Sequence, residues 1–111
     1  MFVLAQPSPE AGSLERLLSE LEFNRVLAGA AHVGGQFEMT QFRRAIADGT
    51  FVWLPEELKV AIQSAYMAMA TANGLVDAAA HHAKTDGAAD AAMKRAQLPI
   101  GKAIKRLQAA L

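Results

Sequence analysis

The sequence predicts an all-α fold: a small helical bundle of three long helices and one short helix, with an antiparallel C-terminal hairpin. In three long stretches apolar residues recur every three or four positions, which is the spacing of a buried helix face. Aromatic residues make up only 6% of the chain and β-branched residues are scattered singly, so strands are disfavoured. Turn signals separate the stretches, at Gly34-Gly35, Asp48-Gly49 and Thr85-Asp86-Gly87.

Length and composition indicate one domain, because 111 residues can bury a single modest core. Residues 1–12, with Pro7, Pro9 and Gly12, are predicted to be an irregular lead-in, and residues 13–111 the bundle. Hydrophobic residues reach 52%, but many are alanine, so we expect a thin core and closely packed helices. The sequence contains no cysteine, which excludes disulfides and thiolate metal sites.

The first long helix is expected to be capped by either Ser8 or Ser13 and to end at Gly34-Gly35. Its apolar stripe consists of Leu14, Leu17, Leu18, Leu21 and Ala28. Asn24 interrupts this stripe. We predict that Asn24 is a hydrogen-bonded polar core residue that fixes the register; the alternative is an edge position that reaches water.

A short helix should follow, with Thr40 as its cap and with Phe42 and Ile46 four residues apart on one face. Asp48-Gly49 is expected to end it. The apolar residues 50–54 come next.

Residues 50–54 have the composition of a strand, but no similar segment exists with which a strand could pair. We therefore predict a turn that plugs one end of the bundle with Phe51 and Trp53. Burial of Trp53 implies that Trp53→Ala would cost about 3–5 kcal/mol.

The third helix is predicted to begin at Pro55 and to continue past Gly74 to the turn at residues 85–87. Its stripe comprises Leu58, Ile62, Ala65, Met69, Ala72 and Val76. The last helix should run from Ala88 to Leu111 as one kinked helix, because its apolar stripe stays in phase across Pro99.

A short turn joins the last two helices, so they should pair as an antiparallel hairpin. This pairing places Asn73 near Pro99, whose ring leaves the backbone carbonyl of Arg95 without its helical donor. We predict that the Asn73 amide, or a water that it holds, donates to a carbonyl freed in this way.

Positions 91–111 hold five basic residues and no acidic one: Lys94, Arg95, Lys102, Lys105 and Arg106. A solvated face explains them, as does pairing with the four glutamates of residues 10–22 in the same or a second molecule. The alternative is contact with an anionic surface, either a membrane or nucleic acid. No aromatic residue is interleaved with these cations to stack on bases, which disfavours nucleic acid.

The sequence predicts no catalytic residue, no metal ligand and no cofactor. His81 and His82, each one turn from an aspartate, come closest to a metal site, but adjacent side chains point about 100° apart on a helix. Glu56 and Glu57 directly follow Pro55, and their carboxylates are explained as favourable charges at a helix start. We therefore expect a protein that is not an enzyme.

The order of signals between residues 20 and 73 resembles that of a known helical module. The signals are Glu-Leu-Glu-Phe-Asn-Arg-Val-Leu from Glu20, then Thr40 to Gly49, Leu54-Pro-Glu-Glu-Leu, Ala65-Tyr66 and Asn73. The module recurs in uncharacterised prokaryotic proteins, often behind a single N-terminal transmembrane helix. The resemblance covers about half the chain. It implies a small helical bundle and a membrane tether, but no activity, and the anchor helix itself is missing.

No run of about 20 apolar residues is present that would span a membrane. The apolar start of the chain is interpreted either as the end of a removed transmembrane segment or as a frayed terminus. The expected localisation is cytoplasmic, or that of a membrane-tethered soluble domain. The expected function is a non-enzymatic interaction module that binds itself, as a homodimer, or another helical protein. The alternative is a peripheral binder of an anionic surface through the basic last helix.

Overall fold

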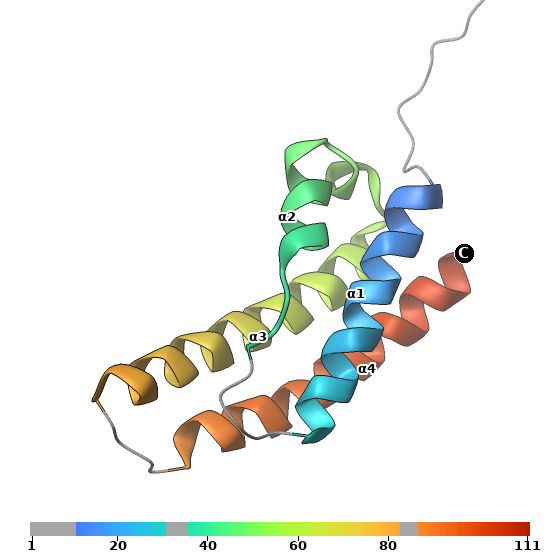
Figure 1. The fold of residues 1–111 in the computed structure, drawn as a ribbon. Coiled ribbons are helices and arrows are strands. Elements are labelled where there is room, and N and C mark those ends of the chain that lie inside the picture. Colours follow the sequence, from blue (N-terminus) through green and yellow to red (C-terminus); the bar gives the residue numbers. More distant parts are fainter. Residues whose placement is uncertain (1–10, 31–35, 83–86) are drawn as a thin grey trace, which may run out of the picture.

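Every regular element is helical in the computed structural model, which describes residues 11–30, 36–82 and 87–111. The elements are α1 (Ala11–Ala30), α2 (Thr40–Ala47), the 3₁₀ turn η1 (Phe51–Trp53), α3 (Glu56–His82) and α4 (Ala88–Ala110). α3 and α4 run side by side as an antiparallel hairpin, α1 packs along α4, and α2 packs against α1 (Figure 1). The predicted bundle of three long helices and one short helix is confirmed.

The core lies where the three long helices meet. Every predicted stripe residue of α3 is buried, and so is the neighbouring Tyr66. The main buried residues of α4 are Met93, Ala96, Ile100, Ala103, Ile104 and Leu107. Those of α1 are Leu14, Leu17, Leu21 and Ala28. Because several of these side chains are alanine, the helix backbones can approach closely and little volume is left to fill.

The helix bounds agree with the spacing of apolar residues but not with the predicted caps. α3 passes through Gly74 and α4 through Pro99 without a break, as predicted. α1 already includes Ala11, two residues before the predicted start of the bundle, so Ser13 lies inside the helix and does not cap it. The Ser13 hydroxyl instead lies 3.4 Å from the Thr50 hydroxyl. Ser8 and Gly34-Gly35 fall outside the described residues.

Residues 50–54 form a turn, as predicted, but the prediction for Trp53 is wrong. Phe51 and Leu54 are buried, whereas the Trp53 side chain is 52% exposed. A 3₁₀ turn has three residues per turn, so an inward Phe51 directs the next two side chains outward. Phe51 packs edge-on against Phe42, with ring centroids 5.6 Å apart. Phe51 and Leu54 thus close this end of the bundle without Trp53.

Candidate functional site

A buried carboxylate on α1, that of Glu20, organises the start of α2. It accepts hydrogen bonds from the backbone N–H groups of Gln41 at 2.9 Å and of Phe42 at 3.2 Å. The first N–H groups of a helix have no partner within the helix, so this carboxylate caps α2 from a neighbouring element. Thr40 was predicted to be the cap, but it is the first helical residue, after Met39 at the cap position.

Tyr66 of α3 joins the same cluster. Its hydroxyl donates to the Glu20 carboxylate at 2.7 Å, and its ring stacks on Phe42 with centroids 4.2 Å apart. Burial, and then the hydrogen bond to Glu20, raise the pKa of the Tyr66 phenol. The phenol therefore stays protonated and acts as a hydrogen-bond donor.

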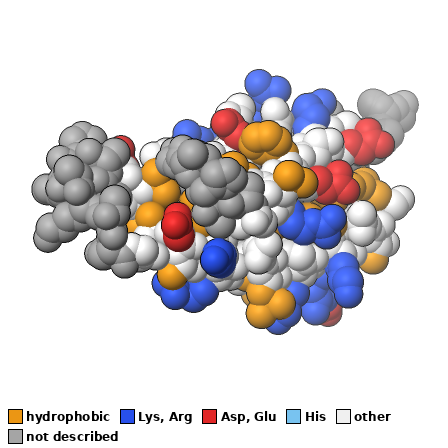
Figure 2. All heavy atoms as spheres, turned by 60° about the horizontal axis from the view of Figure 1, so that its bottom comes forward, with side chains coloured by type: hydrophobic (Ala, Val, Ile, Leu, Met, Phe, Trp, Pro, Cys, Tyr) orange, Lys and Arg blue, Asp and Glu red, His pale blue; other side chains and the backbone are white. Residues whose placement is uncertain are grey.

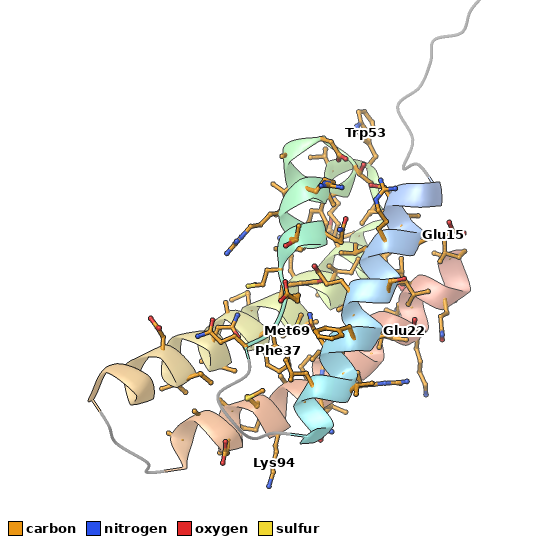
Figure 3. All side chains as sticks on the ribbon, in the orientation of Figure 1. Glu15, Glu22, Phe37, Trp53, Met69 and Lys94 are labelled. Atoms are coloured by element: carbon orange, nitrogen blue, oxygen red, sulfur yellow. The ribbon has the colours of Figure 1, made fainter. Side chains whose placement is uncertain are left out.

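Two asparagines hold the segment that leads into α2. Asn24 of α1 donates to the carbonyl of Glu38 at 2.8 Å and accepts from its N–H at 2.9 Å. Asn73 of α3 donates to the carbonyl of Phe37 at 3.1 Å and accepts from its N–H at 2.7 Å. A side-chain carboxamide carries one acceptor and two donor hydrogens, so each asparagine pairs with both backbone groups of one residue. Phe37 is thereby held between α1 and α3 (Figure 3).

The two asparagine predictions have different outcomes. Asn24 is fully buried and hydrogen-bonded, as predicted. Asn73 is also a structural polar residue, but its predicted partner near Pro99 is wrong, because its amide is taken up by Phe37. In the described part of the chain, every buried side-chain nitrogen and oxygen has a hydrogen-bond partner. We call the cluster of Glu20, Asn24, Tyr66 and Asn73 the polar clamp. Its buried polar atoms are all hydrogen-bonded within the protein, which is typical of a structural cluster.

The five predicted cations of α4 are all exposed, namely Lys94, Arg95, Lys102, Lys105 and Arg106. Arg106 pairs with Glu57 of α3 at 3.1 Å. Lys94 points outward near the start of α4, whereas Glu15 of α1 lies near the other end of that helix (Figure 3). Among the described residues, no carboxylate of α1 lies within ion-pair distance of these cations. On the face shown in Figure 2, basic side chains stand in separate groups among hydrophobic and acidic ones.

The outer face of α3 is exposed and carries no charge over most of its length. No charged residue occurs from Val60 to Val76, which is 17 positions of one helix. Exposed residues of this outer face include Val60, Ser64, Met67, Thr71, Gly74 and Ala78, with Gln63 and Ala70 at its edge. A solvated helix face normally carries charged side chains, so this one has the composition of a contact surface. The signal in the sequence is the long uncharged run, which the spacing of the core stripe does not explain.

A groove of about 480 Å³ adjoins this outer face between α3 and α4. Its apolar lining includes Val60 and Ala61 of α3 with Leu98 and Pro99 of α4, and its charged rim includes Glu57 and Arg106. The exposed Leu98 thus places one apolar side chain of α4 next to the outer face of α3, with Lys102 also lining the groove.

Within residues 11–30, 36–82 and 87–111, no cluster of three or more histidine or carboxylate side chains is arranged to hold a metal ion. The side chains of His81 and His82, and Asp86, lie outside the described part. None of the described helices combines the length and the apolar content needed to cross a bilayer.

No protein-family model, no curated protein and no solved structure matches this chain. The resemblance to a prokaryotic helical module therefore stays a prediction.

Proposed function

We propose that the chain is a non-enzymatic helical interaction module that self-associates through the outer face of α3. The observation that supports this proposal is the absence of charge on that face, together with the exposure of Val60 and Met67. The saturated hydrogen bonds of the polar clamp favour a structural role for the polar groups over a catalytic one.

The spacing of the exposed residues on α3 suits a second helix. Val60, Ser64, Met67, Thr71, Gly74 and Ala78 follow one another at intervals of four and three residues. This alternation places them in a line along one side of a helix, as in a coiled-coil seam. Small residues at Ser64, Gly74 and Ala78 allow a second backbone to come close.

The same line is complementary to itself in the antiparallel direction. A two-fold axis between Met67 and Thr71 would place Met67 opposite Thr71 of a second copy and Val60 opposite Ala78. Each larger side chain then faces a smaller one, which favours close packing. The acidic start of α3 in one copy would also approach the end of the hairpin at which Lys94 and Arg95 of the other copy lie.

Sedimentation of the purified chain over a range of concentrations tests this proposal. We expect a mass that rises toward that of a dimer, and a monomer for Met67→Glu, because the substitution would bury a charge in the contact. Val26→Glu is the matched control, since Val26 of α1 is 72% exposed and Met67 is 70% exposed. A chain that stays monomeric throughout, or an equal effect of both variants, would contradict the proposal.

The second candidate function is peripheral binding to an anionic surface through α4. It is favoured by the exposed Leu98, which has Lys94 four residues before it and Lys102 four residues after it. An apolar residue among cations suits the headgroup region of a membrane. Binding to anionic vesicles would then weaken with salt and be lost in the Lys102→Glu, Lys105→Glu double variant. A chain that only self-associates instead shows no lipid or DNA binding that depends on Lys102 and Lys105.

A further inference from the structure

We infer that the end of the bundle formed by η1 and the end of α2 is a docking site for an anionic lipid bilayer. We call this surface the tip: the exposed apolar residues Ile46, Val52 and Trp53, together with the arginines Arg16, Arg43 and Arg44. The inference does not rest on the α3 outer face.

The apolar part of the tip is unusual for a solvated turn. Val52 and Trp53 are adjacent, and both are more than half exposed, although the neighbouring Phe51 and Leu54 are buried. Ile46, four residues after the partly buried Phe42, is also exposed. Trp53 points away from the bundle at the end where α1 begins (Figure 3). A protruding tryptophan beside two aliphatic residues can enter a headgroup layer without any rearrangement of the core.

Arginines of two helices lie at this end of the molecule. Arg43 and Arg44 are exposed on α2, and Arg16 is exposed on α1. Asp48, the residue after α2, lies near Arg16 and Arg44, and its Oδ1 accepts a hydrogen bond from the Thr50 N–H at 2.9 Å. This hydrogen bond, the Thr50 hydroxyl and then Arg16 and Arg44 lower the pKa of Asp48. The acidic residues that follow η1 pair elsewhere, Glu56 with Lys59 at 3.9 Å and Glu57 with Arg106 at 3.1 Å.

One hydrogen bond joins α1 to this end of the molecule. The Ser13 hydroxyl of α1 lies 3.4 Å from the Thr50 hydroxyl, at the residue before η1. Arg16, one turn further along α1, is close enough to lower the pKa of Asp48, the residue after α2. Arginines of two helices thus lie near this one turn. Exposed arginines beside an apolar centre match an anionic bilayer, whose surface attracts arginine and whose interface accommodates tryptophan.

Trp53 is the only tryptophan of the chain, so its fluorescence reports on the tip alone. The purified chain is mixed with vesicles of phosphatidylcholine, with or without phosphatidylglycerol. We expect a blue shift of the emission, and quenching by brominated lipid, with the anionic vesicles only. Both effects should weaken as salt screens the arginines.

Two double variants identify the surface that binds. Arg43→Glu with Arg44→Glu should weaken vesicle binding by about tenfold or more, because it replaces attraction of two arginines to the anionic surface by repulsion. Lys102→Glu with Lys105→Glu makes the same change of charge on α4 and should leave the emission shift intact. Circular dichroism of each variant establishes that it is folded.

Several results would overturn the inference. One is unchanged Trp53 emission in the presence of anionic vesicles. Another is loss of the shift in the α4 variant alone, because α4 would then be the binding surface. A blue shift that appears with increasing protein concentration and no lipid would place Trp53 in a contact between protein molecules.

Discussion

The α3–α4 hairpin and the segment that carries α2 are held in place by different interactions. The hairpin is joined by regularly spaced apolar side chains that are almost completely buried. The 36–42 segment is joined to α1 and α3 by side chains that bond to backbone groups, chiefly Glu20, Asn24 and Asn73. Apolar packing tolerates small shifts, whereas these hydrogen bonds need particular atoms at particular places. The comparison predicts that the hairpin stays folded when single polar contacts are lost. The position of the 36–42 segment instead depends on a few hydrogen bonds.

The largest effect is expected in the hairpin. Ile100→Ala should lower the free energy of unfolding by about 2–5 kcal/mol, because it leaves a cavity at a fully buried position. Urea denaturation followed by circular dichroism measures the loss. Leu98→Ala is the control two residues away, and its exposed side chain should contribute little. Equal losses for the two variants would mean that α4 presents a different face to the core.

A smaller and more local effect is expected at the clamp. Asn24→Ala removes the hydrogen bonds to the carbonyl and to the N–H of Glu38. This loss should lower the free energy of unfolding by about 1–3 kcal/mol. Amide hydrogen exchange should then become faster in α2, while α3 and α4 keep their protection. The exposed neighbour Arg25 supplies the control variant Arg25→Ala. Uniform acceleration throughout the molecule would show that the segment and the hairpin open as one unit.

The smallest effect at neutral pH is expected for Tyr66→Phe, about 1 kcal/mol, because Glu20 keeps its two backbone donors. The pH dependence is more informative. Burial raises the pKa of Tyr66 in the folded protein, so the phenol ionises on unfolding once the pH exceeds about 10. The contribution of Tyr66 to the free energy of unfolding is therefore constant below that pH. Above it, the contribution falls by about 1.4 kcal/mol per pH unit.

Urea denaturation between pH 9 and pH 11, roughly one unit either side of the ordinary tyrosine pKa, compares the wild type with Tyr66→Phe. Lysine titration is common to both proteins and cancels in the difference. Identical slopes would show that the phenol reaches solvent in the folded state.

Residues of the clamp differ in how far the sequence revealed them. Asn24 could be identified because it interrupts an apolar stripe, which marks a polar residue facing the core. Asn73 was also singled out, but helical pairing suggested the wrong partner. Glu20 gave no signal, since it is one of four glutamates in an acidic stretch and nothing local distinguishes it. The prediction that Trp53 is buried is wrong because hydrophobicity indicates a preference for burial but not the direction of a side chain in a turn.

Helix number, helix order and the buried stripes follow from the sequence, because 3.6-residue periodicity and turn residues are local properties. The partners of Glu20, Asn24 and Asn73, which are 14 to 46 positions away, were set by the tertiary structure. So was the outward direction of Trp53. Hydrogen bonds between distant residues depend on how the helices pack against one another. That arrangement minimises the free energy of the whole chain, and no single stretch of the sequence encodes it.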